Sequence, residues 1–224
     1  MSAVRTAAPI RAGRRRTWLK PAVFTAALVP LASVLFDAAR RQLGADPVNE
    51  TLNRLGLTAL ALLVASLACT PLREILGWTW ATGLRRMLGL FAFFYASLHF
   101  TTYVIVDQGL RARAILADVT KRPFIISGFA AFVLLVPLAW TSTAASVQRL
   151  GFARWKRLHR LAYLAGALAA FHFWLRVKKD VREPAIYAGI LAALLLTRMA
   201  FWLRDARRRR ATALREAARS HPHT

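Results

Sequence analysis

Six apolar stretches, each about as long as a membrane's hydrocarbon core is thick, constrain the fold of this chain of 224 residues more than any other feature. A helix needs ~20 residues to cross ~30 Å of hydrocarbon. The stretches cover 21–37, 53–70, 86–106, 123–141, 155–176 and 184–203. Because backbone groups in lipid must be hydrogen-bonded within the protein, each stretch is predicted to be a helix. The sequence therefore predicts an all-α integral membrane bundle of six transmembrane helices.

The prolines fit this division of the chain. Three of them, Pro21, Pro123 and Pro184, fall at predicted first helical turns, where a missing N–H costs nothing. Pro30 and Pro137 fall inside predicted helices, and we expect neighbouring helices to supply the hydrogen bonds lost there. The sequence has no internal repeat. It predicts one membrane domain, residues 18–205, between basic cytoplasmic tails at 1–17 and 206–224.

The charge of the chain, formally +23, lies in the gaps between the apolar stretches rather than on one face. This is the pattern of membrane loops and argues against a nucleic-acid binder. The N-terminal side of the predicted membrane carries 21 of the 33 lysines and arginines, and the opposite side carries 11. Both termini are therefore predicted to be cytoplasmic. Arg15-Arg16 resembles a twin-arginine signal, but no small-residue cleavage site follows, so the first span is predicted to stay uncleaved.

Three histidines, His99, His159 and His172, lie within or at the ends of the apolar stretches. A polar ring in hydrocarbon rarely lacks a partner, and neutral imidazole is a usual axial ligand of haem iron. Each histidine shares its helix face with small residues, which either let helices pack closely or leave a slot for a flat macrocycle. The repetition of this face at three histidines favours the slot. Cys69, the only cysteine, excludes an intrachain disulfide and a four-cysteine iron–sulfur cluster.

The spacing of the histidines separates them into two levels. His159 and His172 are 13 residues apart, a rise of about 20 Å on a helix, so one haem iron cannot bind both. His99 and His172 are predicted to lie in the outer half of the membrane and to be the two axial ligands of one haem. His159 lies near the cytoplasmic face, where it either binds a second haem or is an interfacial histidine bonded to a lipid headgroup or a cofactor.

Basic residues at the helix ends have two interpretations: they pair with haem propionates or a flavin phosphate, or they reach lipid phosphates. The residues concerned are Arg85, Arg86, Arg157 and Arg160 inside, and Arg176 and Lys178 outside. No Asp or Glu stands in mid-span, and no hydrolase, P-loop or dinucleotide motif occurs. A proton-coupled transporter, a hydrolase and an ATPase are therefore disfavoured, and no catalytic residue is assigned. Transmembrane electron transfer remains the favoured function, with a haem-free permease or scaffold and a stand-alone ferric or quinone reductase as alternatives.

Several stretches together resemble the haem-binding membrane subunits of the bacterial periplasmic protein-methionine-sulfoxide reductase system. They include LGADPV (43–48), TPLR (70–73), RRMLGLFAFFYASLHFTTYVIVD (85–107), KRPFIISG (121–128), WKRLHRLAYL (155–164) and HFWLRVK (172–178), and the resemblance spans about residues 17–205. More widely, the chain resembles ferric-reductase and NADPH-oxidase transmembrane domains. Those usually carry two histidines on each of two helices, whereas this chain has Arg85 and Arg86 where the second histidine of the first helix would fall.

The resemblance implies a six-helix inner-membrane protein that binds haem b, with FMN also associated. Electrons would come from the quinone pool or a cytosolic flavin reductase. They would pass to a periplasmic molybdopterin-containing partner subunit that reduces methionine sulfoxide in proteins. His99, His159 and His172 match the family's haem-ligand positions, whereas no motif places the flavin. The basic tails lie outside the resemblance, and we expect them to bind anionic lipid at the inner face.

Overall fold

The computed structural model describes residues 18–177 and 180–220, and these residues form helices joined by short connections. The N-terminal tail with Arg15 and Arg16, Lys178, and residues 221–224 lie outside the described part of the chain. The elements are α1 (Leu19–Ala39), α2 (Pro47–Leu76), α3 (Thr79–Thr82), α4 (Arg85–Thr101), the π-helix η1 (Thr102–Asp107), α5 (Ala112–Lys121), α6 (Pro123–Trp140), α7 (Ala144–Leu150), α8 (Phe152–Leu158), α9 (Leu161–Arg176) and α10 (Arg182–Ser220).

The prediction of an all-helical membrane protein is confirmed in its main part. Within the described residues, five helical segments are long and apolar enough to cross a membrane: α1, α2, α4 with η1, α6, and α10. Many of their large apolar side chains are exposed; Phe36, Phe129 and Leu196, for example, are more than half accessible. Such side chains fit an exterior that faces lipid. The loops predicted between the apolar stretches contain the short helices α3, α5 and α7.

The fifth predicted span, 155–176, is wrong as a single helix. The chain forms α8, a tight turn at His159 and Arg160, and then α9, which has 16 residues. In this turn the Arg160 N–H donates to Arg157 O, and the Tyr163 N–H donates to Arg160 O, so i→i+3 bonds replace the α-helical pattern. The Trp155 indole N–H donates to Thr141 O, which holds α8 against the end of α6.

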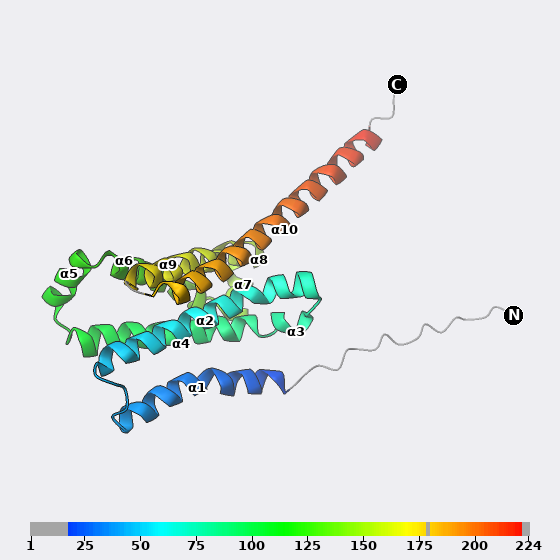
Figure 1. Cartoon of the computed structure of the whole chain (residues 1–224). Helices are drawn as coiled ribbons and strands as arrows, with labels where there is room; N and C mark the ends of the chain where they lie inside the picture. The colour runs from blue at the N-terminus through cyan, green and yellow to red at the C-terminus, as the bar shows by residue number, and fades with distance from the viewer. Residues whose placement is uncertain (1–17, 178–179, 221–224) are drawn as a thin grey trace.

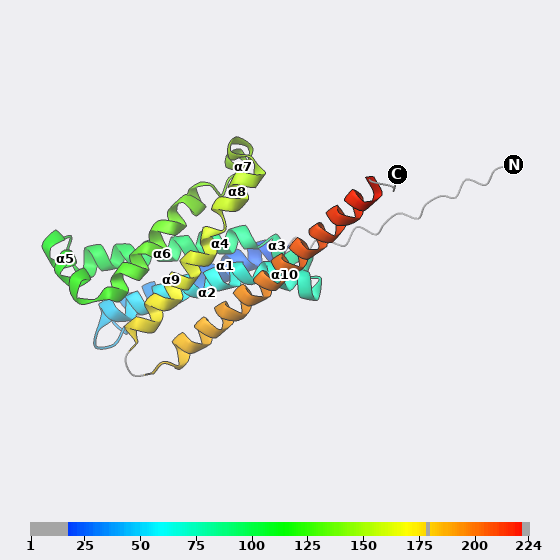
Figure 2. The same cartoon turned by 90° about the horizontal axis from the view of Figure 1, so that it is seen from above.

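Two tightly packed helix pairs, α2 with α4 and α6 with α9, form the centre of the bundle. In Figure 2 the α6–α9 pair lies at an angle across the α2–α4 pair. The chain runs the length of the bundle in alternating directions along α1, α2, α4, α6, α9 and α10 (Figure 1). The start of α1, α3, α7 and the far end of α10 consequently lie at one end, which we call the α3 end; α5 marks the other, the α5 end.

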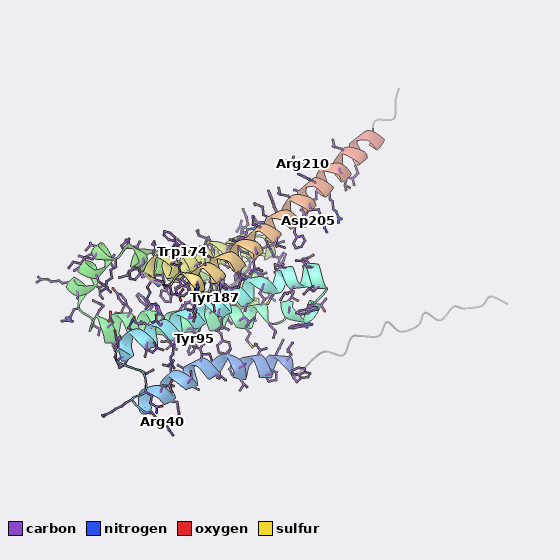
Figure 3. All side chains as sticks on the ribbon, in the orientation of Figure 1. Arg40, Tyr95, Trp174, Tyr187, Asp205 and Arg210 are labelled. Atoms are coloured by element: carbon purple, nitrogen blue, oxygen red, sulfur yellow. The ribbon has the colours of Figure 1, made fainter. Side chains whose placement is uncertain are left out.

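Tyr95 joins α1 to this centre. Its hydroxyl donates to Ala27 O (2.7 Å) and accepts from the Leu31 N–H (3.1 Å), two groups that would bond directly to each other in a regular helix. Pro30 lies between them and interrupts the helical hydrogen-bond pattern. Figure 3 shows Tyr95 projecting from α4 toward α1. A neighbouring helix thus supplies hydrogen bonds beside the internal proline, as the sequence suggests.

The last helix does not end where its apolar stretch ends. α10 continues to Ser220 and projects beyond the bundle, where Arg210 is exposed (Figures 1 and 3). Residues 206–220 are rich in alanine and arginine, which are strong helix formers, so the helix has no local reason to stop at the predicted domain boundary. Inside the apolar part, the Arg198 guanidinium lies 5.4 Å from the centre of the Tyr163 ring, which gives this charge a partner.

Candidate functional site

The imidazole rings of His99 and His172 face each other across the bundle. His99 is in the last turns of α4, and His172 is in the last turns of α9, so both lie toward the α5 end. Their ring centroids are 6.2 Å apart, and the ring planes are at 84° to each other. Both side chains are half-buried. The structure therefore brings together the two histidines that the sequence predicts to act as a pair.

The Nδ1 atom of each ring forms a hydrogen bond with a backbone carbonyl of a neighbouring helix. His99 Nδ1 lies 2.9 Å from Leu52 O of α2, and His172 Nδ1 lies 2.7 Å from Phe124 O of α6. Since a carbonyl only accepts, each Nδ1 carries the hydrogen and donates it. Each Nε2 then keeps its lone pair available. Histidine ligands of metals typically show this arrangement, because the outer hydrogen bond fixes the tautomer and the ring orientation.

The donor set and the spacing fit a metal bound between the two rings. If both Nε2 atoms pointed at one shared metal, two metal–nitrogen bonds of about 2 Å and two ring radii of about 1.1 Å would give a centroid separation of about 6.2 Å. No group of three or more metal-ligating side chains occurs among the described residues. Two imidazoles alone do not form the four-ligand cage of a structural zinc site, but they could hold a haem, whose ring would supply the other nitrogens.

His159 is separate from this pair and lies at the turn between α8 and α9. Its Nδ1 is 3.1 Å from Trp155 O, and its ring stacks on the Trp155 indole at a centroid distance of 4.0 Å. Its Nε2 is buried and has no hydrogen-bond partner among the described residues. A buried polar atom without a partner is costly, so this nitrogen is suited to receive a metal or a donor from a bound group.

The predicted basic partners lie at the ends of the helices. Arg86, Arg157 and Arg160 are exposed, and no hydrogen bond or ion pair is seen for their side chains in the described structure. Arg85 is half-buried and donates to Thr70 Oγ1 at 3.4 Å. At the α5 end, Arg176 donates to Asn49 Oδ1 at 2.9 Å.

The small residues two turns from each paired histidine pack against the core. Ala92 precedes His99 by seven residues and Ala165 precedes His172 by seven, and neither is accessible to solvent. Both belong to one core cluster, together with Leu63, Leu135 and Leu138. At this level the small residues permit close helix packing, which is the simpler of the two interpretations of their pattern.

Sequence reasoning missed the groups that hold the rings. Leu52 and Phe124 act through their backbone carbonyls, and a carbonyl leaves no signature in the identity of its residue. Phe124 does fall within the KRPFIISG stretch, directly after the helix-starting Pro123. The only sequence signal for this contact is therefore that Phe124 belongs to a stretch that resembles the haem-binding subunits.

Known proteins show where the chain belongs. Residues 55–170 match the ferric reductase like transmembrane component family. The chain is 52% identical over 182 residues to the protein-methionine-sulfoxide reductase heme-binding subunit MsrQ of Deinococcus radiodurans, a match that covers 81% of this chain and 90% of that protein. It is 48% identical to the proteins of the same name from Herminiimonas arsenicoxydans (83% and 86% covered) and Brucella ovis (85% and 84%). The chain therefore belongs to the MsrQ family, within the ferric reductase like membrane proteins.

Proposed function

We propose that this chain is the haem-binding membrane subunit of a protein-methionine-sulfoxide reductase and carries electrons across the membrane by haem b. The observation that carries the proposal is the His99–His172 pair: two imidazoles at 6.2 Å, each with its Nδ1 bonded to a carbonyl. The names of the relatives support haem binding and the reductase system.

In this proposal the two helix pairs do the positioning. His99 and His172 would hold the haem iron, and the carbonyls of Leu52 and Phe124 would fix the tautomer that leaves both Nε2 lone pairs free for it. Bound haem supplies reversible one-electron chemistry. Exclusion of water by the apolar helices around the rings tunes the reduction potential. No side chain has to transfer a proton to a substrate.

His159 is the proposed ligand of a second haem, near the α3 end. The support is its buried Nε2 without a partner and its stacking on Trp155. Arg86, Arg157 and Arg160 are proposed to pair with the propionates of this group, since they lie near the same end and are exposed. FMN stays a prediction of the family resemblance, to which no described residue is assigned.

The direction of electron flow follows from the proposed topology. We place six membrane crossings in residues 18–205 and both termini in the cytoplasm, with α9 as the fifth crossing. The basic tails at 1–17 and 206–224 would then bind anionic lipid of the inner membrane. Electrons would enter from the quinone pool or a cytosolic flavin reductase. They would leave near the His99–His172 pair to a periplasmic molybdopterin-containing subunit.

Spectroscopy of the purified protein tests the proposal. The wild type in detergent should show a b-type Soret band and a ferric low-spin signal from two axial imidazoles. Either His99→Ala or His172→Ala should abolish that signal, because each removes one ligand. His159→Ala is the matched control and should retain it. Full retention in His99→Ala or His172→Ala would contradict the pairing.

The same preparation separates the alternatives. A colourless protein, purified after expression with ample haem, would favour a haem-free permease or scaffold. Rapid ferric or quinone reduction without any partner subunit would favour a stand-alone reductase.

A further inference from the structure

We infer that Gly56 and Gly128 are positioning residues for the haem ligands, because their missing side chains let each imidazole reach a helix backbone. The inference rests on the proposed function, in which His99 and His172 bind one iron. It assigns roles to two residues of α2 and α6 that have no metal-ligating group. These glycines lie in the two helices that support the ligand-bearing helices α4 and α9.

Gly128 leaves no room for a methyl group. A Cβ built on its backbone would lie 2.6 Å from His172 Nδ1 and 2.9 Å from Cε1. Contacts below 3.0 Å essentially never occur for real Cβ atoms, so the ring would have to move. The same Nδ1 atom donates to Phe124 O at 2.7 Å. Any shift that relieves the clash therefore disturbs that hydrogen bond.

Gly56 has the same relation to His99, with slightly more room. A Cβ at Gly56 would lie 3.1 Å from both Nδ1 and Cε1 of His99. This is tighter than nine in ten real Cβ contacts, but a displacement of a few tenths of an ångström relieves it. His99 Nδ1 donates to Leu52 O at 2.9 Å. The two sites thus share one geometry and differ in the distance between the added Cβ and the imidazole ring.

Helix geometry explains why glycine occurs at these two positions. In both cases the glycine follows the accepting residue by four positions: Leu52 and Gly56, Phe124 and Gly128. Cα–Cβ bonds in a helix tilt toward its N-terminus, so the side chain at i+4 covers the carbonyl of residue i. Glycine at i+4 uncovers that carbonyl, which can then accept from an imidazole in addition to its helical N–H.

The arrangement is specific to the facing pair. Among the described glycines, only Gly56 and Gly128 have an imidazole among the atoms nearest to the built Cβ. Gly89 and Gly166 instead face Ser66 and Leu67, as expected for ordinary close packing between helices. His159 donates to the carbonyl four residues before it in its own chain segment and uses no glycine.

Alanine substitutions test the inference, with Gly189→Ala as the matched control because nothing lies within 4 Å of its Cβ. All three glycines are inside helices, where alanine is intrinsically preferred, so loss of helix cannot explain a defect. The readouts are the haem-to-protein ratio, the ferric EPR spectrum and the midpoint potential. Thermal unfolding and size-exclusion elution of each variant report on its fold.

Gly128→Ala should lose the low-spin bis-imidazole EPR signal. Gly56→Ala should keep haem but show a changed EPR spectrum and a more positive midpoint potential. A weakened Nδ1 hydrogen bond makes the imidazole a poorer donor, and a poorer donor stabilises ferric iron less. Gly189→Ala should match the wild type in all three readouts.

Wild-type EPR spectra and potentials in both Gly56→Ala and Gly128→Ala would overturn the inference. If Gly128→Ala does not accumulate as folded protein, Gly56→Ala decides: a changed spectrum and potential support the inference, and unchanged ones overturn it. Failure of the proposed function looks different, because the wild type itself would then lack the low-spin haem signal.

Discussion

The hydrogen-bond partner of Nδ1 distinguishes the three membrane histidines at the scale of single residues. His99 and His172 donate to carbonyls of other helices, which fixes each ring relative to the whole bundle. His159 is bonded to the carbonyl four residues before it and stacks on Trp155, so its position depends on a local turn. We therefore expect the paired site to be the more rigid of the two.

His159→Ala should lower the haem-to-protein ratio and leave the His99–His172 EPR signal intact. The two sites share no ligand, and His159 lies about 20 Å along the helix direction from His172. A pyridine-haemochrome measurement on wild type and variant gives the ratio. An unchanged ratio would place His159 outside haem ligation and leave it as an interfacial histidine.

At the scale of helices, contacts between elements stabilise the break after α8 and the opened turn of α1. The break between α8 and α9 is held by the Trp155 bond to Thr141 O. The π-helix η1 begins three residues after His99, within the same apolar stretch. α1 contains Pro30, and the hydroxyl of Tyr95 bridges the opened turn. In lipid such repairs must come from protein, because no water is available.

Tyr95→Phe should destabilise the packing of α1 against the bundle by about 1–3 kcal/mol, the usual cost of leaving a buried polar group unsatisfied. Tyr95 is fully buried, and its hydroxyl contacts two backbone groups of α1. Thermal unfolding in detergent measures the loss. Tyr187→Phe on α10 is the control, since no hydrogen bond of its hydroxyl is seen in the described structure. Equal stability of wild type and Tyr95→Phe would show that Ala27 O and the Leu31 N–H of α1 do not depend on the Tyr95 hydroxyl.

At the scale of the whole molecule, the two ends of the bundle differ in chemistry. The α3 end carries the long basic continuation of α10, with exposed arginines at 204 and 207–210. The α5 end carries the His99–His172 pair and two ion pairs of Arg54, one with Asp37 that joins α1 to α2 and one with Glu50 within α2. This asymmetry supports the α3 end as cytoplasmic and the α5 end as the side of electron delivery.

Single cysteines test this orientation directly, because the chain contains only Cys69, which is 3% exposed. In a Cys69→Ala background, Arg113→Cys on α5 should react with a membrane-impermeant thiol reagent added to intact spheroplasts. Arg208→Cys on α10 should react only after the membrane is opened. Both positions are exposed, so accessibility to the reagent is not limited by burial. The reverse labelling pattern would invert the proposed topology.

Much of the fold was predictable because it depends on local composition. The predicted stretches 21–37, 86–106 and 123–141 agree closely with α1, α4 with η1, and α6. The predicted boundaries fail where another effect dominates: α2 and α10 extend beyond their apolar stretches, and a tight turn interrupts 155–176. Hydrophobicity locates the part of a helix that lies in lipid, whereas helix propensity and capping set its ends.

Local chemistry along the chain is enough to specify an all-helical membrane protein and to select its polar membrane residues. Helical periodicity and spacing also separate His159 from His172 and place His99 at the level of His172. The carbonyls of Leu52 and Phe124 and the glycines beside the rings become visible only when α2 packs on α4 and α6 packs on α9. The two hydrogen bonds to these carbonyls join residues 47 and 48 positions apart in the sequence, and no local pattern encodes how two helices meet at such a separation.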